Sequence, residues 1–311
     1  MTRAAAFTRL GVDAGEKRAI LGDVEVLTTN DELSACLDRF GERSCVLVPT
    51  MGGLHPGHAS LVSIGAEHAR RHGLRGGAVA TVFVNPTQFD QSSDFDRYPR
   101  VLEADAAMCE EAGASAVYAP RPEDVYPPYG SVVVPDLPAV ATEPGLEDRF
   151  RPGHVEGVCQ VVKRLFELCR PAAAVFGEKD WQQVQVVAAL SAMHGLGVDI
   201  VAAPLVREDD GLAMSSRNRF LSPADRAKAG QISRALVLGQ GEATPDAAEA
   251  VMREHLVRHG FVIDYATVRD ARTLMPMGDR WEGRTARALI TARLGSGPKV
   301  VRLLDNAPWP G

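Results

Sequence analysis

The sequence predicts an α/β protein built on a doubly wound, Rossmann-like parallel sheet, with a second, smaller α+β domain. Short apolar runs without polar alternation recur between residues 45 and 203, as in strands buried on both faces. Helical patterns separate these runs, which is typical of a parallel sheet covered by helices. After about residue 205 the apolar runs alternate with polar residues, which predicts a different kind of sheet.

Length and composition agree with a two-domain globular protein. The chain has 311 residues, of which 45% are hydrophobic and 24% charged, and about 150 residues make one domain. The net charge is −6, and the short basic cluster at residues 70–75 lies where a helix is expected to end. A dedicated nucleic-acid-binding protein is therefore not expected.

Cysteines and apolar runs indicate where the protein is expected to work. The five cysteines are odd in number and show no C-x-x-C spacing, so we expect free thiols in a reducing compartment. The start of the chain has no apolar stretch of signal-peptide length, and no run reaches about 18 apolar residues. These features predict a cytoplasmic protein without a membrane partner.

The elements of the first domain follow in a regular order. Residues 1–24 are expected to be an extension, followed by a helix over 31–41 with Asn30 or Asp31 as N-cap. Buried strands are expected at 45–48, 78–84, 115–118, 172–176 and 198–203. Helices are expected at 59–72, 102–111, 157–169 and 181–194, each ended by a nearby Gly or Pro. Because ligands of such sheets bind at the carboxyl ends of strands, function is expected in the loops there.

The second domain is expected to begin near Pro204. Two helices are predicted at 223–239 and 245–260, each with Pro in its first turn. Three strands follow at 262–269, 286–294 and 300–304, and their alternation predicts a small antiparallel sheet with one wet face. The expected division is 1–24 for the extension, 25–204 for the nucleotide- and substrate-binding domain, and 205–311 for a lid domain.

The loop after the first parallel strand is rich in glycine and histidine. It reads Pro49-Thr50-Met51-Gly52-Gly53-Leu54-His55-Pro56-Gly57-His58. Such a strand-to-helix loop binds phosphate in many α/β proteins, because free N–H groups and the helix dipole point into it. The Lys-Ser/Thr pair of a P-loop is missing, but His55 and His58 can face one way and donate hydrogen bonds to phosphate. The alternative is a glycine-rich loop with two exposed histidines.

Polar residues also follow two other predicted strands. Asn85 and Gln88 follow the second strand, and a neutral amide can donate to and accept from a ligand that has hydroxyl and carboxylate groups. Lys179 follows the fourth strand and would place a positive charge on phosphate. The alternatives are loop-closing amides in the first case and a solvated turn with Asp180 as N-cap in the second.

These segments together resemble one known family. The H-x-G-H pattern is similar to that of the class I nucleotidyltransferase superfamily, and the longer string closely resembles the pantothenate synthetase (pantoate–β-alanine ligase) family. Further motifs of this family follow in order, and the resemblance spans residues 26–306. They are Phe83-Val84-Asn85-Pro86-Thr87-Gln88-Phe89, Tyr98-Pro99-Arg100, Arg151-Pro152-Gly153-His154, Gly177-Glu178-Lys179-Asp180-Trp181-Gln182-Gln183, Asp210-Gly211-Leu212-Ala213-Met214-Ser215-Ser216-Arg217-Asn218 and Leu303-Leu304-Asp305-Asn306. The departures are mild: Thr87 where Met is common, and Ala59 where a hydrophobic residue is common.

The resemblance implies an activity. Family members form an acyl-adenylate from pantoate and ATP, release pyrophosphate, and let the amine of β-alanine displace AMP to give pantothenate. Positioning and electrostatic stabilisation of phosphate would then supply most of the catalysis. The segment 214–217 also resembles a variant of the K-M-S-K-S loop of class I aminoacyl-tRNA synthetases, in which two hydroxyls and Arg217 could wrap the phosphates. Its alternative is a capping loop.

The resemblance also implies roles for single residues. It assigns catalysis to His58, His55, Lys179 and Arg217, with His58 as the general-acid candidate. It assigns substrate contacts to Gln88, Gln183 and Asn85. It assigns ATP binding to Met51, Gly52, Gly53, Leu54, His55, Pro56, Gly57, His58, Gly177, Glu178, Lys179, Asp180, Val206, Met214, Ser215, Ser216 and Arg217.

Metal, partners and rival functions complete the expectations. Mg²⁺ is expected with ATP. Its protein ligands are unknown; Asp105 is a candidate, against the alternative of a solvated acidic helix face. Family resemblance implies a homodimer. Two other functions stay open: another H-x-G-H nucleotidyltransferase acting on a phosphorylated substrate, which the neutral Gln88 and Gln183 disfavour, and a non-catalytic ATP-binding protein.

Overall fold

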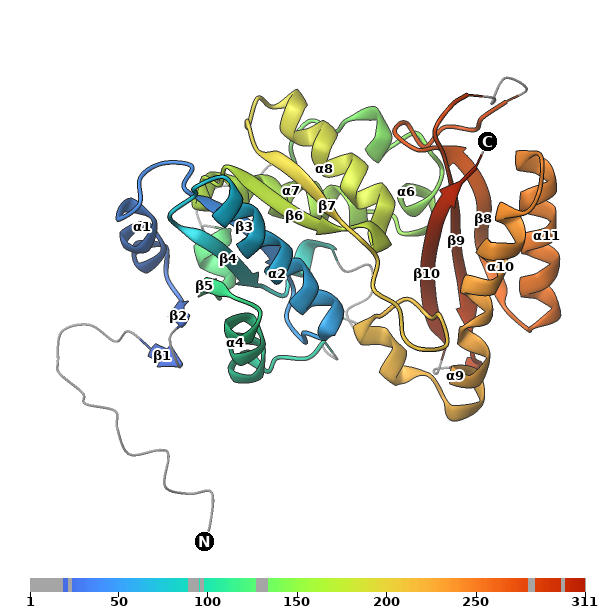
Figure 1. The fold of residues 1–311 in the computed structure, drawn as a ribbon, viewed down its shortest axis with the longest axis horizontal. Coiled ribbons are helices and arrows are strands. Elements are labelled where there is room, and N and C mark those ends of the chain that lie inside the picture. Colours follow the sequence, from blue (N-terminus) through green and yellow to red (C-terminus); the bar gives the residue numbers. More distant parts are fainter. Residues whose placement is uncertain are drawn as a thin grey trace, which may run out of the picture.

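Two sheets with helices packed on them make up the protein (Figure 1). The computed structural model describes residues 19–21, 24–88, 95, 98–126, 134–278, 283–297 and 300–310. Most of the expected N-terminal extension lies outside the described residues, as does Phe89. The expected fold class, a covered parallel sheet followed by a smaller α+β part, is confirmed. The boundary near Pro204 stays a prediction; it falls in the segment that joins the two sheets.

The larger sheet has seven strands. They are β1 Ala19–Leu21, β2 Val24–Leu27, β3 Cys45–Thr50, β4 Gly77–Val82, β5 Ala114–Tyr118, β6 Ala173–Gly177 and β7 Asp199–Ala203. Their order is β1-β2-β5-β4-β3-β6-β7, and all neighbours are parallel except the β1–β2 pair. The chain therefore leaves β3 toward β4 on one side and returns to β6 on the other, which makes the β3–β6 boundary a topological switch point.

The first two strands correct the prediction for the start of the chain. The sequence predicts an extension over residues 1–24, but β1 lies within that range and forms one edge of the sheet together with β2. With three and four residues they are too short to show a period. Helix α1, Asn30–Asp38, also differs, because Thr29 is its N-cap in a capping box with Glu32 rather than Asn30 or Asp31.

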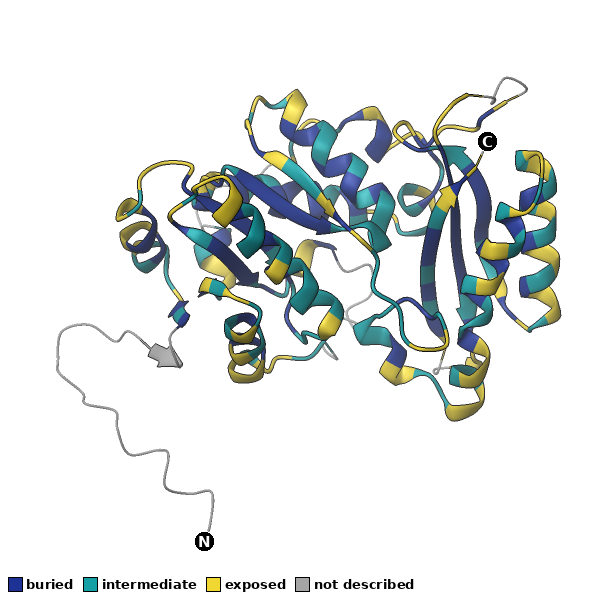
Figure 2. Cartoon of the chain, in the orientation of Figure 1, coloured by how far each residue is buried: buried dark blue, intermediate teal, exposed yellow. Residues whose placement is uncertain are grey.

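Helices cover both faces of the larger sheet. Helices α2 (Pro56–Arg71) and α4 (Leu102–Glu111) pack on one face, and α1, α7 (His154–Cys169) and α8 (Trp181–Met193) pack on the other. Figure 2 shows the central strands β3, β4 and β6 as mostly buried between these layers, whereas the edge strand β7 is partly exposed. Strand β3 explains the continuous apolar runs: Val46 and Val48 contribute to one core cluster and Cys45 and Leu47 to the other, so both faces need apolar side chains.

The smaller sheet contains β8 (Val262–Asp270), β9 (Ala286–Leu294) and β10 (Val301–Trp309), antiparallel in the order β10-β9-β8. Helices α10 (Gln231–Gln240) and α11 (Pro245–Arg258) cover one face. The single helix expected over 223–239 is in fact two, α9 (Pro223–Ala229) and α10, which meet at Gly230. Shorter elements are α5 Pro122–Val125, α6 Glu147–Phe150, η1 Pro86–Gln88, η2 Ala139–Ala141, η3 Glu178–Asp180 and η4 Ser216–Phe220.

The expectation of one wet face on the smaller sheet is wrong. Every residue of β9 is buried except Arg293, which is half-buried. The second face packs against the layer of α7 and α8, where Tyr265 and Leu289 join a cluster with Val155 and Leu190. A polar residue of an alternating strand can still be buried when a second layer covers it, and the sequence pattern does not show that layer.

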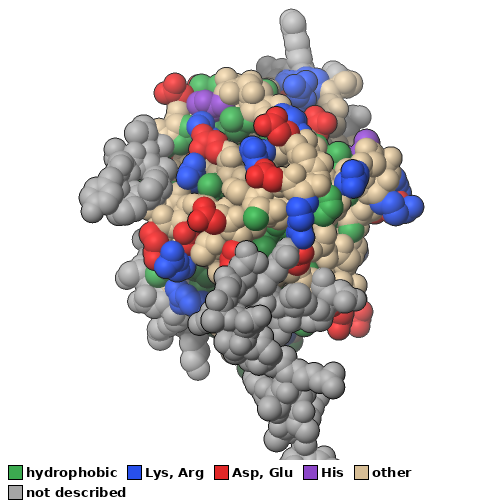
Figure 3. Space-filling model, turned by 90° about the vertical axis from the view of Figure 1, so that its left-hand side faces the viewer, with side chains coloured by type: hydrophobic (Ala, Val, Ile, Leu, Met, Phe, Trp, Pro, Cys, Tyr) green, Lys and Arg blue, Asp and Glu red, His purple; other side chains and the backbone are tan. Residues whose placement is uncertain are grey.

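Surface and thiol features agree with the sequence. All five cysteines are buried and free. The basic cluster ends α2, where Arg70 and Arg71 pair with Glu67. The face seen in Figure 3 intersperses acidic and basic side chains. No helix in the described ranges is long and apolar enough to cross a bilayer.

A largely buried ion network joins helix α6 to the smaller sheet. Arg302 of β10 donates to both oxygens of Glu147 at 2.7 Å and to Asp264 at 2.8 Å. The hydroxyl of Tyr265 donates to Glu147 at 2.7 Å. Burial by itself would raise the pKa of Glu147, but Arg302, Tyr265 and Arg151 outweigh burial and lower this pKa to about 2.

We expect Arg302→Met to lower the free energy of unfolding by about 3 kcal/mol at neutral pH, because Glu147 and Asp264 lose the cation that they share. Among the described cations, Glu147 then keeps only Arg151 at 3.8 Å, and Asp264 keeps Arg293 at 3.1 Å. A carboxyl with a lowered folded-state pKa adds stability above its unfolded pKa and loses it as pH falls toward the folded value. The difference between wild type and variant should therefore shrink between about pH 4.5 and about pH 2. Urea titrations of both proteins at several pH values measure this difference in the free energy of unfolding.

The matched control is Arg258→Met, which removes an exposed i,i+4 pair with Glu254. This variant should stay close to wild type at every pH, because exposed pairs contribute little. A stability loss for Arg302→Met that does not change with pH would contradict the assignment of the effect to the Glu147 carboxylate.

Candidate active site

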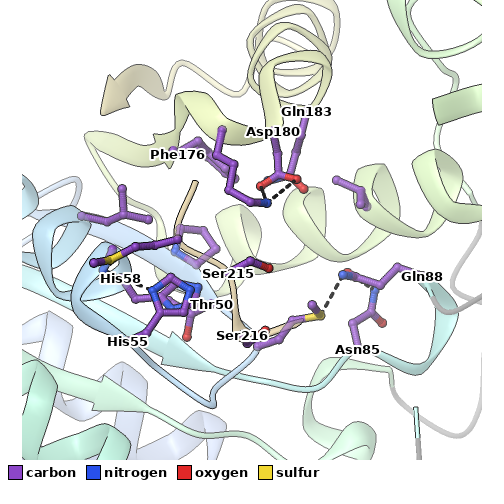
Figure 4. Close-up of a pocket in the computed structure, with 18 of the residues that line it drawn as sticks. Thr50, His55, His58, Asn85, Gln88, Phe176, Asp180, Gln183, Ser215 and Ser216 are labelled. Carbon is purple, nitrogen blue, oxygen red and sulfur yellow. Dashed lines mark hydrogen bonds and ion pairs between the residues drawn. The ribbon is translucent and has the colours of Figure 1, made fainter. Parts of the chain in front are cut away.

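A cavity lies at the carboxyl ends of β3, β4 and β6, facing the segment that follows β7 (Figure 4). The sheet order brings the loops after these strands together, although the residues are far apart in sequence. Most sequence-predicted site residues line it, namely Met51, His55, Gly57, His58, Asn85, Gln88, Gly177, Lys179, Asp180, Gln183, Val206, Met214, Ser215, Ser216 and Arg217. Five others, Gly52, Gly53, Leu54, Pro56 and Glu178, do not line it.

Asp105 holds the loop after β3 in place. Its side chain is 2% exposed, and its two oxygens accept from the backbone N–H groups of Gly53 at 2.9 Å and Leu54 at 2.8 Å. Gly52 has φ +85°, and a Cβ there would lie 2.9 Å from Asp105 Oδ2, so only glycine fits. Asp105 is thus buried and does not lie on a solvated helix face, which corrects that interpretation, whereas its role as a metal ligand stays a prediction.

The geometry assigns a tautomer to His55. His55 is the N-cap of α2, and its Nδ1 accepts from the N–H of Gly57 at 3.1 Å. Its proton is therefore on Nε2, which makes the imidazole a donor on its other side. The ring centroids of His55 and His58 lie 4.0 Å apart, and Figure 4 shows both rings beside the cavity.

Both imidazoles are neutral in the ligand-free cavity. Burial, then the charge of Lys179, lowers the pKa of His55 to about 4. Burial, then His55 and Lys179, lowers the pKa of His58 to about 3. In the described part of the chain, the buried His58 Nδ1 has no hydrogen-bond partner. These pKa values disfavour His58 as a general acid before an anion binds and favour both rings as neutral hydrogen-bonding groups.

The segment after β4 orients Gln88. The Nδ2 of Asn85 donates to Gln88 Oε1 at 3.0 Å, and Asn85 Oδ1 accepts from the hydroxyls of Tyr126 at 2.7 Å and Thr87 at 3.1 Å. Since Gln88 Oε1 is an acceptor, its Nε2 is directed to Met51 and the cavity. A Cβ on Gly157 would lie 2.4 Å from Thr87 O, so glycine there lets α7 approach this segment. Gln88 offers N–H donors to a ligand, and Asn85 positions it.

The segment after β6 carries the charged residues. Lys179 Nζ lies 3.3 Å from Asp180 Oδ2, and both line the cavity. Asp180 is at the N-cap position of α8 but its side chain makes no capping hydrogen bond, so the alternative of a capping turn is not supported. Gln183 points to the cavity (Figure 4), whereas Gln182 is buried and accepts from the N–H of Glu147 at 2.9 Å.

The segment 214–217 closes the cavity from the other side. Met214 N donates to Val206 O at 3.0 Å, and Ser215 Oγ accepts from Arg217 N at 3.3 Å as the N-cap of η4. The capping alternative is therefore right for Ser215. Ser216 and Arg217 nonetheless line the cavity, so one segment caps its helix and faces the site.

Arg151 and His154 were absent from the predicted site, although their motif was recognised. Both line the cavity. Arg151 Nη1 lies 2.8 Å from His154 Nε2, so this nitrogen accepts and Nδ1 donates to Gln88 O at 2.8 Å. Burial, then Arg151, lowers the pKa of His154 to about 4. The Arg-x-x-His spacing at a helix start was the signal that could have identified them.

The charge balance of the cavity favours anions. Lys179, Arg151 and Arg217 line it, and among the described residues Asp180 is its one carboxylate. No cluster of three or more His, Cys, Asp or Glu able to hold a metal ion occurs in the described ranges. The arrangement can hold a polyanion beside neutral amide donors.

Comparison with known proteins gives a consistent result. Residues 25–308 match the family model described as pantoate-beta-alanine ligase. A pantothenate synthetase of a Nocardioides species is 44% identical over 90% of this chain and 84% of its own length. That of Acidiphilium cryptum is 46% identical over 88% of this chain and 94% of its own length.

Solved structures agree. The pantothenate synthetase of Thermus thermophilus has 40% identity and a TM-score of 0.80, covering 91% of this chain and 98% of its own. The pantoate-beta-alanine ligase of Francisella tularensis, complexed with beta-gamma ATP and beta-alanine, has 25% identity and a TM-score of 0.71, covering 92% and 98%.

We expect Asp105→Ala to weaken ATP binding by about tenfold, because two buried N–H groups lose their acceptor, at a cost of about 1–3 kcal/mol. Calorimetric titration with ATP measures the loss. Raising the Mg²⁺ concentration should not restore binding, and restoration would instead identify Asp105 as a magnesium ligand. Glu103→Ala, on the exposed side of the same helix, is the control.

The histidine pKa values predict the pH dependence. NMR signals of His55 and His58, assigned with His55→Gln and His58→Gln variants, should not titrate above about pH 5 without ligand. Bound ATP should raise both midpoints, since phosphate charge favours the imidazolium. A midpoint between about pH 6 and 7 in the ligand-free protein would contradict the burial argument.

Proposed function

This chain belongs to the pantoate-beta-alanine ligase family, and from that premise we propose that it condenses pantoate with β-alanine to pantothenate at the expense of ATP. One observation carries the proposal: two neutral histidines at a helix start, a lysine and a Ser-Arg pair surround the same cavity as two glutamine amides. The cations suit a triphosphate, and the neutral amides can donate to the carboxylate and hydroxyl groups of pantoate. The reaction provides a precursor of coenzyme A.

We propose that the first step forms pantoyl adenylate and pyrophosphate. A carboxylate oxygen of pantoate attacks the α-phosphorus of ATP, and the bond from that phosphorus to the bridging oxygen breaks. Negative charge moves onto the pyrophosphate as it leaves. His55 Nε2–H, Lys179 and Arg217 are placed to stabilise it, and the N-terminal N–H groups of α2 add their dipole.

In the second step the amine of β-alanine attacks the acyl carbon, the bond to the AMP oxygen breaks, and the amine loses a proton. The enzyme is thus an AMP-forming ligase. Gln88 directs its Nε2 to the acyl group, and Gln183 binds pantoate from the opposite wall. Arg151, beside His154 and Gln88, supplies a cation for the carboxylate of β-alanine.

Magnesium enters this proposal as part of the nucleotide substrate. Mg²⁺ commonly keeps several waters and takes one or two carboxylates together with phosphate oxygens. The cavity fits that pattern, because Asp180 is its one carboxylate among the described residues and Asp105 is occupied by backbone donors. A homodimer and a cytoplasmic location remain part of the proposal, on family resemblance and on the free cysteines respectively.

Pyrophosphate release tests the proposal. With MgATP, release should require pantoate, and adding β-alanine should yield AMP and the amide in equal amounts. Lys179→Met should lower kcat/KM by about 10²–10³-fold, because it removes charge stabilisation near the phosphates. The same substitution at the exposed Lys228 should change nothing. If the protein binds ATP but releases no pyrophosphate when pantoate is added, this function is wrong. Phosphorylated acceptors would then be screened.

A further inference from the structure

Strand β10 carries two adjacent buried polar residues, Asp305 and Asn306, that the reaction does not use directly. They are 1% and 3% exposed. We propose that they are positioning residues that hold Lys179 and the Ser215–Arg217 segment at a set distance from each other. The inference rests on the proposed function in one respect, since it takes the ATP phosphates to lie between these two segments.

Asn306 holds the segment that carries Lys179. Its Nδ2 donates to the carbonyl oxygens of Glu178 at 2.9 Å and Lys179 at 2.8 Å. Its Oδ1 accepts from Arg287 Nε at 2.6 Å, which determines which way the amide faces. Arg287 also pairs with Glu178 at 2.8 Å and lies 3.6 Å from the ring centroid of Trp181. The backbone on both sides of Lys179 is thus attached to the smaller sheet.

Asp305 holds the base of the opposite segment. Its two oxygens accept from Arg207 at 2.7 and 3.0 Å, and Oδ1 also accepts from Asn306 N at 2.7 Å. Arg207 donates in addition to Gly211 O at 2.8 Å and forms a β-bridge with Ala213. Ser215 follows two residues after that bridge. Arg207 therefore sets the position of the Ser215–Arg217 segment, and Asp305 in turn holds Arg207.

Strand geometry explains why two adjacent residues can do this. Successive side chains of a strand point to opposite faces of the sheet. Leu304 belongs to the cluster against α8 and Leu303 to the cluster against α10, so Asn306 shares the first face and Asp305 the second. Strand β10 contacts both η3 and η4. One dipeptide therefore reaches both phosphate-binding segments, and a displacement of the strand would move both.

A double-mutant cycle tests the role of Asn306. Asn306→Ala should lower kcat/KM for ATP by about 10²-fold, as expected when a catalytic group is misplaced by about 1 Å. In the Lys179→Met background the same change should cost less than about threefold, because the group that Asn306 positions is gone. Asn306→Asp, which keeps the acceptor for Arg287 and loses both donors, should behave alike and replaces Asn306→Ala if that variant does not fold.

Asp305 is tested by the same rule. Asp305→Asn should lower kcat/KM for ATP in the wild-type background and lower it much less in the Arg217→Met background. Gln240→Ala is the matched control, because Gln240 donates to Pro308 O of the same strand at 2.7 Å but contacts neither segment. It should keep full activity. Equal fold-losses in both backgrounds would overturn the proposal, since the residues would then act only through stability.

Direct ATP titration separates this inference from the proposed function. The cycle is repeated with calorimetric ATP affinity as the readout, without pantoate. If the wild-type protein binds ATP but releases no pyrophosphate with pantoate, the proposed function fails. The positioning role of Asn306 is still decided in that case, because the cycle shows whether the effects of Asn306→Ala and Lys179→Met on ATP affinity are coupled. Thermal unfolding of each variant shows that it is folded at the assay temperature.

Discussion

The neighbourhood of β3 and β6 is the constraint on which the site depends. These two parallel strands are adjacent in the sheet but 120 or more residues apart in the chain, because the connections from β3 proceed to β4 and β5 before the chain crosses back. Their carboxyl ends therefore place His55 and Lys179 in one cavity. Burial lowers the pKa of both histidines, and Lys179 lowers it further, for His58 after the effect of His55. A different strand order would leave the same residues without a common ligand.

The smaller sheet contributes to the site although none of its strands lines the main cavity. Its inner face packs an apolar cluster against α7 and α8, and polar residues and ion pairs lie around that cluster. Hydrophobic contact is not directional, so it alone would tolerate sliding. Ion pairs with a sheltered carboxylate, such as Arg207–Asp305 and Arg302–Glu147, need a defined geometry, and breaking such a pair costs more than forming it gains. They favour one placement of the sheet relative to the cavity.

Electrostatics and hydrogen bonding divide the cavity into two ends. Toward the start of α2 lie imidazoles kept neutral by burial, together with Lys179 and Arg217, and this end suits phosphate. Toward η1 and α7 lie the amide of Gln88, held by Asn85, and the Arg151–His154 pair. A nucleotide and an organic acid can therefore meet with each charge matched.

The sequence by itself determined the motifs of the site and the order of strands β3 to β7. Apolar runs predicted β3 to β7 within a few residues, and the motif residues around His55, Gln88, Lys179 and Ser216 do line one cavity. Tertiary structure decided what those patterns do not encode. The role of Asp105 depends on the loop after β3, whose N–H groups it accepts. The burial of β9 depends on the layer supplied by α7 and α8. Asn306 contacts Glu178 and Lys179, from which it is separated by 128 and 127 positions in the chain. Periodicity and loop motifs report local preferences along the chain, whereas these contacts exist only after the sheets have packed.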